Sequence, residues 1–431
     1  MVLRSPPPAL CLLPAERIAL RLNPVTLLEP NPICPPPPWR PEQLRERLTA
    51  CAALVSETRR FWDHRPFIER AAPWEDSERA LALWLRGLSD AEVDALEAEG
   101  VRDGPLAPLQ ARVDDVTALP APRAEPSKTP PWLNIKGRKR RQISWFRAAL
   151  GAERGLPSSS LLVDWCGGKG HLSRVLGGDA PSPVLVVDHD RSLLSAAERL
   201  APPTTSLSVR CADVTSASIE LPEGAGLVAL HACGCLSDQA LKTADRGQAR
   251  WLAVVPCCHH KAPLGGWRPM SATARQLGVD LSANGLRLTI ADEVTASERV
   301  RARRRHNMVW RVGADLLLKA RSGVDQWQRL EELPKSAYHL PYAAYCAAAL
   351  AAKGLKPPPA WRPDLHLRQA KEAVRVGRAL SLPRGVVRPA LELLCVLDRA
   401  LWLQERGWSV SVSRFCPSEV TPRNLLIYAT R

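Results

Sequence analysis

The chain has 431 residues and a formal net charge of +15, from 59 Lys and Arg against 44 Asp and Glu. Its length allows two or three domains with a sizeable core. No apolar run reaches the length of a transmembrane helix, so we expect no membrane association. The positive charge favours a polyanionic partner such as RNA, although an arginine-rich compositional bias would produce the same excess. The 12 cysteines are scattered along the chain, which indicates reduced thiols in the cytoplasm rather than a disulfide framework.

The N-terminal part predicts an extended arm followed by helices. Residues 1–41 are rich in proline and form the predicted arm; prolines also interrupt the apolar part that a signal peptide would need. Residues 42–115 predict a helical accessory region, because Gln43–Val55 and Ser77–Leu96 have helical apolar spacing. Residues 116–131 combine prolines with polar neighbours and predict a linker.

A basic cluster opens the next region, residues 132–264, which we expect to be the core of the protein. Lys136–Arg141 is almost entirely cationic and precedes an amphipathic helical stretch. One interpretation is a contact to phosphate or RNA near the mouth of a cofactor site; the other is a solvated helix face.

The stretch Leu161–Leu176 reads as a buried strand, a glycine-rich turn and the first turns of a helix. Rossmann-type proteins hold a nucleotide-like cofactor in this way. Gly168 and Gly170 remove Cβ atoms where the backbone approaches a ligand, and the new helix offers N–H groups to a carboxylate. Asp164, at the strand end, is placed to take a cationic amine. This suits S-adenosylmethionine better than a pyrophosphate, since a dinucleotide fingerprint would have glycine in place of Cys166.

Two further acidic strand ends follow. Val184–Asp188 is a second apolar run, and Asp188 follows Gly168 at the spacing of about 20 residues at which such folds place an acid on the ribose hydroxyls. Leu207–Asp213 predicts a third strand, and Asp213 ends it where S-adenosylmethionine enzymes commonly contact the adenine amine. Acids at the ends of three successive strands favour a ligand site over a fold that binds nothing.

The rest of the chain predicts the remaining strands of a seven-stranded sheet. Gly226–Gly234 and Trp251–His260 are the fourth and fifth strands, and the alternation of short apolar runs with helical stretches favours an α/β fold with a parallel sheet. Residues 386–431 predict the last helix, over Pro389–Arg406, and then two strands, the last pair antiparallel.

Between these parts, residues 265–385 predict a largely helical insertion after the fifth strand. Its arginine run, Val300–His306, is interpreted either as an RNA platform beside the cofactor cleft or as a solvated helix.

Three motifs carry a resemblance to a known family: Asp164–Ser173, Leu230–Gly234 and Val255–His259. Together they resemble one family of class I methyltransferase domains. It includes the methyltransferase half of the glutathione S-transferase C-terminal domain-containing protein and proteins named for a ribosomal RNA adenine dimethylase domain, and it is similar to the tRNA ribose methyltransferases. The resemblance covers roughly Trp132–His260. It implies a Rossmann-like class I methyltransferase sheet and S-adenosylmethionine as cofactor but supplies no substrate; many relatives carry Asp where Cys235 stands here.

Cysteines and histidines are concentrated after the fourth and fifth predicted strands. The set is His231, Cys233, Cys235, Cys257, Cys258, His259 and His260. Because the carboxyl ends of neighbouring parallel strands meet at one edge, we expect these side chains to line the substrate side of the cleft.

Several roles stay open for this set. It forms a substrate pocket in which His231 acts as a general base or orients a nucleophile; or it binds zinc or an iron–sulfur cluster, although the spacings are no standard zinc signature. A third possibility is attack by Cys257 or Cys233 on C6 of a pyrimidine, and a fourth is that Cys233, Cys257 and Cys258 are buried packing residues. We name His231 and Cys257 as catalytic candidates and assign no metal ligand.

The sequence thus predicts an S-adenosylmethionine-dependent methyltransferase that acts on RNA, either tRNA or rRNA. The predicted cofactor contacts are Asp164, Gly168, Gly170, Asp188 and Asp213. The motif after the fourth strand lacks the Asn/Asp-Pro-Pro-Tyr pattern of adenine N6 methylases, which disfavours that atom, and no DNA specificity is expected. The alternatives are a non-catalytic RNA-binding protein with a vestigial cofactor fold and a protein methyltransferase. The methylated atom and the oligomeric state stay open.

Overall fold

The computed structural model describes residues 37–431 except 68, 70, 122–125, 127–134, 152–155, 180–181, 204, 217–218, 262–265, 292–295, 325–329 and 332. The first 36 residues of the predicted proline-rich arm, most of the predicted linker and the start of the predicted core at 132–134 therefore lie outside the described residues.

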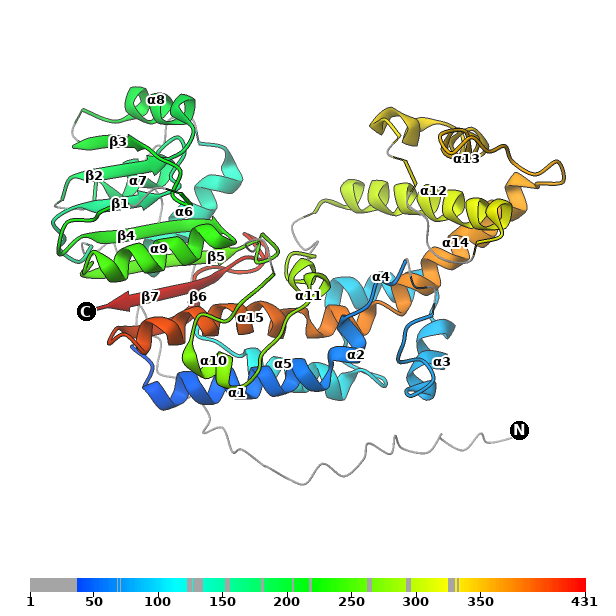
Figure 1. Ribbon diagram of the computed structural model, residues 1–431, viewed down its shortest axis with the longest axis horizontal. Coiled ribbons are helices and arrows are strands. Elements are labelled where there is room, and N and C mark those ends of the chain that lie inside the picture. The colour runs from blue at the N-terminus through cyan, green and yellow to red at the C-terminus, as the bar shows by residue number, and fades with distance from the viewer. Residues whose placement is uncertain are drawn as a thin grey trace.

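A seven-stranded sheet lies at one end of the molecule (Figure 1). The strands are β1 (Leu162–Trp165), β2 (Val184–Asp188), β3 (Leu207–Cys211), β4 (Gly226–Cys233), β5 (Trp251–Cys257), β6 (Ser409–Arg414) and β7 (Leu425–Thr430). Their order is β3-β2-β1-β4-β5-β7-β6, with β7 antiparallel to both of its neighbours and the first five strands parallel. This confirms the predicted α/β fold class and its seven-stranded methyltransferase-like sheet.

Helices cover both faces of the sheet, which is why β1 and β5 are buried along their whole length. The helices that accompany the first five strands are α6 (Gly137–Ala149), α7 (His171–Leu176), α8 (Arg191–Leu200) and α9 (Cys235–Arg246). Ile143 and Phe146 of α6 share a core cluster with Leu162 of β1 and Val255 of β5. The basic helix that precedes the first strand is therefore part of the sheet's own core.

A long helix, α15 (Leu382–Gln404), connects the sheet to the N-terminal helices. It packs against β6 and β7 as well as against α1 (Pro41–Glu57), and almost all of it is buried. The sequence analysis expected this helix to begin at Pro389, because proline favours the first turn of a helix. The structure continues the helix through Pro389, since the apolar surface buried between the two parts begins earlier, at Leu382.

The N-terminal region contains short helices that pack around α15. After α1 they are α2 (Arg59–Trp62), α3 (Arg79–Gly87), α4 (Asp90–Glu99) and α5 (Ala107–Thr117). The single helical stretch expected over Ser77–Leu96 is wrong, because a break separates α3 from α4. Ser89 caps α4 and Glu92 bonds back to the backbone of Ser89, a capping box that is visible in the sequence.

The region after β5 is largely helical, and its later helices project away from the sheet (Figure 1). Its elements are α10 (Ala272–Gln276), α11 (Ala283–Leu288), α12 (Glu298–Ser322), η2 (Lys335–His339), α13 (Tyr342–Ala351) and α14 (Pro363–Ala379). We use "the arm" for α12, α13 and α14, which share a core of their own around Tyr345 and Leu350. None of the helices in the described ranges is long and apolar enough to cross a bilayer.

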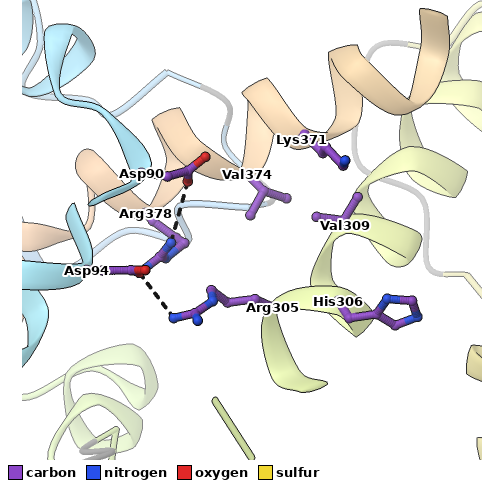
Figure 2. A pocket seen from close by; sticks show the side chains of 8 residues that line it. All are labelled: Asp90, Asp94, Arg305, His306, Val309, Lys371, Val374 and Arg378. Carbon is purple, nitrogen blue, oxygen red and sulfur yellow. Dashed lines mark hydrogen bonds and ion pairs between the residues drawn. The ribbon is translucent and has the colours of Figure 1, made fainter. Parts of the chain in front are cut away.

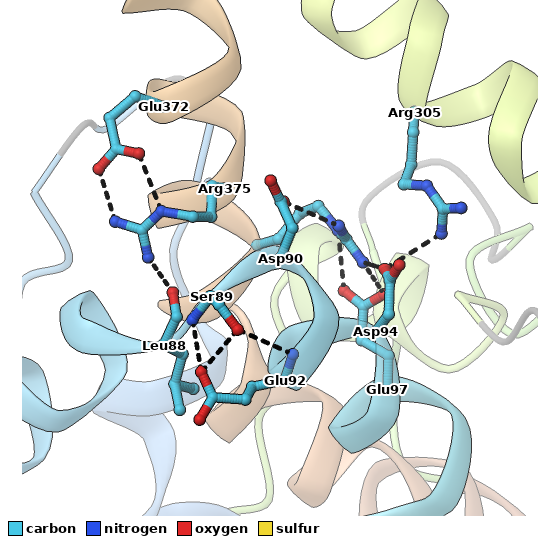
Figure 3. A network of polar contacts seen from close by, with 10 residues as sticks. Leu88, Ser89, Asp90, Glu92, Asp94, Glu97, Arg305, Glu372 and Arg375 are labelled. Carbon is cyan, nitrogen blue, oxygen red and sulfur yellow. Dashed lines mark hydrogen bonds and ion pairs between the residues drawn. The ribbon is translucent and has the colours of Figure 1, made fainter.

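An ion-pair network joins the arm to α4 (Figure 3). The buried guanidinium of Arg378 lies 2.5 Å from Asp94 and 2.6 Å from Glu97, and Arg305 of α12 reaches the same Asp94 at 3.1 Å. A pocket of about 220 Å³ opens beside this network and includes His306 (Figure 2). The arginine run lies on α12, which packs mainly on α13 and α14, and Arg305 is paired at this joint. The choice between an RNA platform and a solvated helix stays a prediction.

Candidate functional site

The glycine-rich turn between β1 and α7 has the left-handed backbone that its sequence indicates. Gly168 and Gly170 have φ values of 56° and 62°, and Cys166, a non-glycine residue, has φ of 57°. A Cβ on Gly167 would lie 2.7 Å from the carboxylate of Asp164, whereas one on Gly168 would meet nothing nearer than 3.8 Å. Gly167 is therefore required by packing and Gly168 by its conformation, because a Cβ on Gly168 would make only ordinary van der Waals contacts, with Leu193 and Asp188.

Asp164 links the two ends of this turn. Its side chain is 2% exposed, and one carboxylate oxygen accepts hydrogen bonds from both the backbone N–H and the hydroxyl of Ser173 in α7. Burial raises the pKa of Asp164 to about 6, against the opposing effect of the Ser173 hydrogen bonds. The structure thus shows Asp164 holding α7 to β1, and its predicted contact with a cofactor amine stays a prediction.

Asp188 holds the turn from the end of β2. Its Oδ2 accepts the N–H of Gly168 at 3.0 Å, and its Oδ1 accepts the N–H of Asp190 at 3.0 Å. Oδ1 also lies 3.2 Å from Nδ1 of His189. A carboxylate has about four lone-pair positions, so Oδ2 retains capacity for a further donor such as a ribose hydroxyl.

Asp213 lies beyond the end of β3 and is exposed. It accepts hydrogen bonds from the N–H and hydroxyl of Thr215, which lower its pKa. The three predicted acids converge on Cys166: burial raises the pKa of that thiol to about 12, and Asp188, Asp164 and Asp213 each add to the rise. The acidic strand ends therefore meet around the glycine-rich turn, as their spacing predicted.

Lys139 is a site residue that the sequence analysis did not single out. It lies in the first turns of α6 and is half-buried. Burial lowers its pKa, while Asp164 and Cys257 oppose that shift, which places the ammonium group between the glycine-rich turn and the end of β5. The signal in the sequence was the basic cluster before the first strand, but nothing in the cluster distinguishes Lys139 from its neighbours.

His231 occupies a strained position in β4. The pairing of β4 with β5 shifts between Leu230 and Ala232, and His231 at the shift has φ of 69°. Its ring lies against Phe415, with centroids 6.3 Å apart, and its Nε2 is buried without a partner among the described residues. Non-glycine residues in this conformation cluster at functional sites.

The surroundings of His231 argue against the predicted role as general base. Burial, the largest cause, and the charges of Lys139 and Arg423 lower the pKa of His231 to about 3. An imidazole with so low a pKa is a weak base, because cations nearby disfavour its protonated form. It is well suited to hydrogen-bond a group while staying neutral.

Three of the predicted cysteines meet at the end of the sheet. Cys233 and Cys257 are the paired last residues of β4 and β5, and their sulfur atoms are 3.5 Å apart. The sulfur of Cys258 joins them, with all three Sγ atoms within 4.8 Å of one another. We call Cys233, Cys257 and Cys258 the cysteine triad. The sequence analysis expected these cysteines at one edge of the sheet and weighed a metal site there, but it assigned no metal ligand.

The histidines after β5 do not join the triad. His259 is 2% exposed, and both of its ring nitrogens lack a partner among the described residues. Burial lowers its pKa well below the usual value, and the next largest cause is the charge of Arg399 in α15. The expected single pocket lined by all seven cysteines and histidines is therefore wrong, because consecutive residues of the β5 turn face different neighbours.

Comparison with known proteins supports a methyltransferase domain in this part of the chain. Residues 138–263 match the model of a family described as a methyltransferase domain. Among solved structures, coclaurine N-methyltransferase bound to N-methylheliamine and SAH is 13% identical, with a TM-score of 0.23, over 50% of this chain and 58% of that one. The 4+2 cyclase SpnF is 17% identical, with a TM-score of 0.21, over 35% of this chain and 55% of that one. The chain thus spans little more than half the length of either protein.

Proposed function

We propose that this protein is an S-adenosylmethionine-dependent methyltransferase that acts on RNA. The observation that carries the proposal is the convergence of Asp164, Asp188 and Asp213 on the glycine-rich turn, within the region that matches a methyltransferase domain. When bound, S-adenosylmethionine supplies an electrophilic methyl group.

The residues around the turn fit the parts of this cofactor. Oδ2 of Asp188, which accepts the N–H of Gly168, retains a lone pair for a ribose hydroxyl. Asp213 is exposed at the neighbouring strand end and would accept from the adenine amine. Lys139 is a cation near Asp164 and would bind the cofactor carboxylate. Gly168 and Gly170 would let the backbone approach closely.

Methyl transfer depends above all on in-line positioning of the nucleophile. His231 lies on β4, the neighbour of β1, and Cys257 lies on β5, the neighbour of β4; they are our candidates for contact with the substrate. Since the pKa of His231 is lowered to about 3, we propose that the neutral ring positions the nucleophile by a hydrogen bond and does not remove its proton.

RNA is favoured as substrate by the charge around the site. Arg138 and Lys139 both act electrostatically on His231, so the first turn of α6 borders the proposed substrate side. Lys136 and Arg138 are exposed there, and phosphates attract such cations. All ten cysteines in the described ranges are free thiols, which agrees with the cytoplasmic location that we propose.

The cofactor is tested by isothermal titration of the full chain with S-adenosylmethionine and S-adenosylhomocysteine. We expect binding of both in about the micromolar range and a loss of about 100-fold or more in Asp188→Ala, which removes the ribose acceptor. Asp103→Ala is the matched control, because Asp103 is an exposed carboxylate in the N-terminal region. Absence of binding by a folded wild-type sample would refute the enzyme and leave an RNA-binding protein with a vestigial cofactor fold.

The substrate is tested by transfer of a tritiated methyl group to total cellular RNA and protein. We expect label that ribonuclease removes and protease leaves. Label that only protease removes would refute RNA as substrate and identify a protein methyltransferase.

A further inference from the structure

The cysteine triad presents three sulfur atoms on one side of two neighbouring strands. In an extended strand, successive side chains point to opposite faces. Cys258 has the left-handed φ of 50°, and this turn of the backbone lets its sulfur and that of Cys257 lie within 4.8 Å of each other. A left-handed non-glycine residue costs free energy, so bringing these two adjacent thiols together requires local backbone strain.

The turns that carry the triad are fixed by one another. The N–H of Gly234 donates to the carbonyl of Cys257 at 2.7 Å, and the N–H of Lys261 donates to the carbonyl of Cys258 at 2.8 Å. A Cβ on Gly234 would lie 2.2 Å from the carbonyl oxygen of Lys261. The backbone of both strand ends therefore fixes where the three side chains begin before any ligand binds, and only their χ1 angles remain free to adjust the sulfur atoms.

The spacing of the sulfur atoms suits a tetrahedral metal ion. Zinc–sulfur bonds of about 2.3 Å in a tetrahedron place sulfur atoms about 3.8 Å apart. The Cys233 and Cys257 sulfurs are 3.5 Å apart, and every pair of the triad lies within 4.8 Å. Adjustments of less than about 1 Å, within reach of χ1 changes, would bring all three to bonding distance.

A metal ion with charge +2 bound by three thiolates would have a net charge of −1. Lys261, whose backbone N–H donates to the carbonyl of Cys258 at 2.8 Å, is a cation of the same turn and would offset that charge.

We propose that Cys233, Cys257 and Cys258 bind a zinc ion through three thiolates, with the fourth coordination position filled by water or substrate. Three soft ligands from two strand ends select zinc or a similarly thiophilic ion over magnesium or calcium. The proposal does not depend on methyl transfer, because the ligands and their geometry are present whatever the domain catalyses.

The test is metal analysis of the full chain, purified under reducing conditions from zinc-supplemented medium. We expect about one zinc per chain and, on exchange with cadmium, a sulfur-to-metal charge-transfer band. Cys258→Ser and Cys233→Ser should each lower zinc affinity at least about tenfold. Cys211→Ser and Cys395→Ser are the matched controls and should keep the metal, since Cys211 is exposed at the end of β3 and Cys395 is buried in α15.

A second measurement needs no variant. Alkylation of the wild-type chain, mapped by mass spectrometry, should modify exposed Cys211 with or without zinc and modify Cys233 and Cys258 only after zinc is removed. A folded chain that holds less than about 0.1 zinc, gives no cadmium band and shows no zinc-dependent protection overturns the proposal. These readouts are independent of cofactor titration, so the metal site and the methyltransferase proposal fail or hold separately.

Discussion

The carboxyl edge of the sheet and the helical arm differ in backbone strain and in the pairing of their buried polar groups. The edge contains three of the four non-glycine residues with positive φ in the described part of the chain, Cys166, His231 and Cys258. The arm contains none of these residues; its left-handed positions there are Gly323 and Gly354, which follow α12 and α13.

The two regions also treat charge differently. At the edge, Asp164 and His231 are buried with shifted pKa values. In the arm, buried Arg378 is neutralised by Asp94 and Glu97. A pocket lies beside the arm's network, yet none of the predicted site residues lines it (Figure 2). Backbone strain and unpaired buried polar groups, more than the size of a pocket, distinguish the proposed functional region.

The largest contrast should come from two glycines with similar φ. Gly234 has φ of 55° and ψ of −124°, and Gly234→Ala would place a Cβ 2.2 Å from the Lys261 carbonyl. We therefore expect the free energy of unfolding to fall by several kcal/mol. Gly323→Ala, at φ of 66° with nothing within 4 Å, should cost about 1 kcal/mol. Urea unfolding of both variants measures the difference. Equal losses would show that the edge is no more constrained than the arm.

The joint of the arm gives the next effect. Arg378→Met removes a buried guanidinium that two carboxylates share (Figure 3), and we expect a loss of about 2 kcal/mol in unfolding free energy, because those carboxylates are only partly exposed. Arg305→Met removes a more exposed partner of Asp94 and should cost less than about 1 kcal/mol. Thermal unfolding checks the order, and a larger loss in Arg305→Met would contradict it.

Charge reversals compare the two basic helices. Arg138 in α6 and Arg303 in α12 are both exposed, but only Arg138 acts on the proposed substrate side. We expect Arg138→Glu to weaken RNA binding about tenfold and to reduce its salt dependence, and Arg303→Glu to weaken it less than about threefold. Filter binding at several salt concentrations measures both. The opposite order would move the RNA platform to the arm.

The last prediction concerns the pH dependence of stability. His231 has a pKa of about 3 in the folded chain against about 6.5 when unfolded. Between these values only the unfolded chain takes the proton, so stability falls as pH falls, by about 1.4 kcal/mol per pH unit. Asp164, whose pKa is raised to about 6, opposes this loss of stability below that pH, and it does so equally in the wild-type chain and in His231→Gln. His231→Gln should flatten the fall; an unchanged slope in urea unfolding from pH 6.5 to 4 would contradict the burial of a neutral ring.

The sequence alone determined the sheet and the acidic side of the site. Short apolar runs that end in Asp164 and Asp188 are local features, and parallel strands bring their carboxyl ends to one edge whatever the rest of the chain does. Asp164 and Asp188 accordingly lie on neighbouring parallel strands, β1 and β2, at the same edge of the sheet. The signal for the break between α3 and α4 is also local in the sequence, in the capping box of Ser89 and Glu92, although the predicted helical stretch ran through it.

Only the tertiary structure decided the contacts that depend on backbone reversals and on packing between distant segments. The left-handed turn at Cys258 separates its sulfur from the ring of His259, although the two residues are adjacent. The partners of Lys139 and of the arginine run lie far away in the chain. Such contacts are set by which surfaces the whole fold buries, and a local pattern of residue types contains no information about a partner so far along the chain.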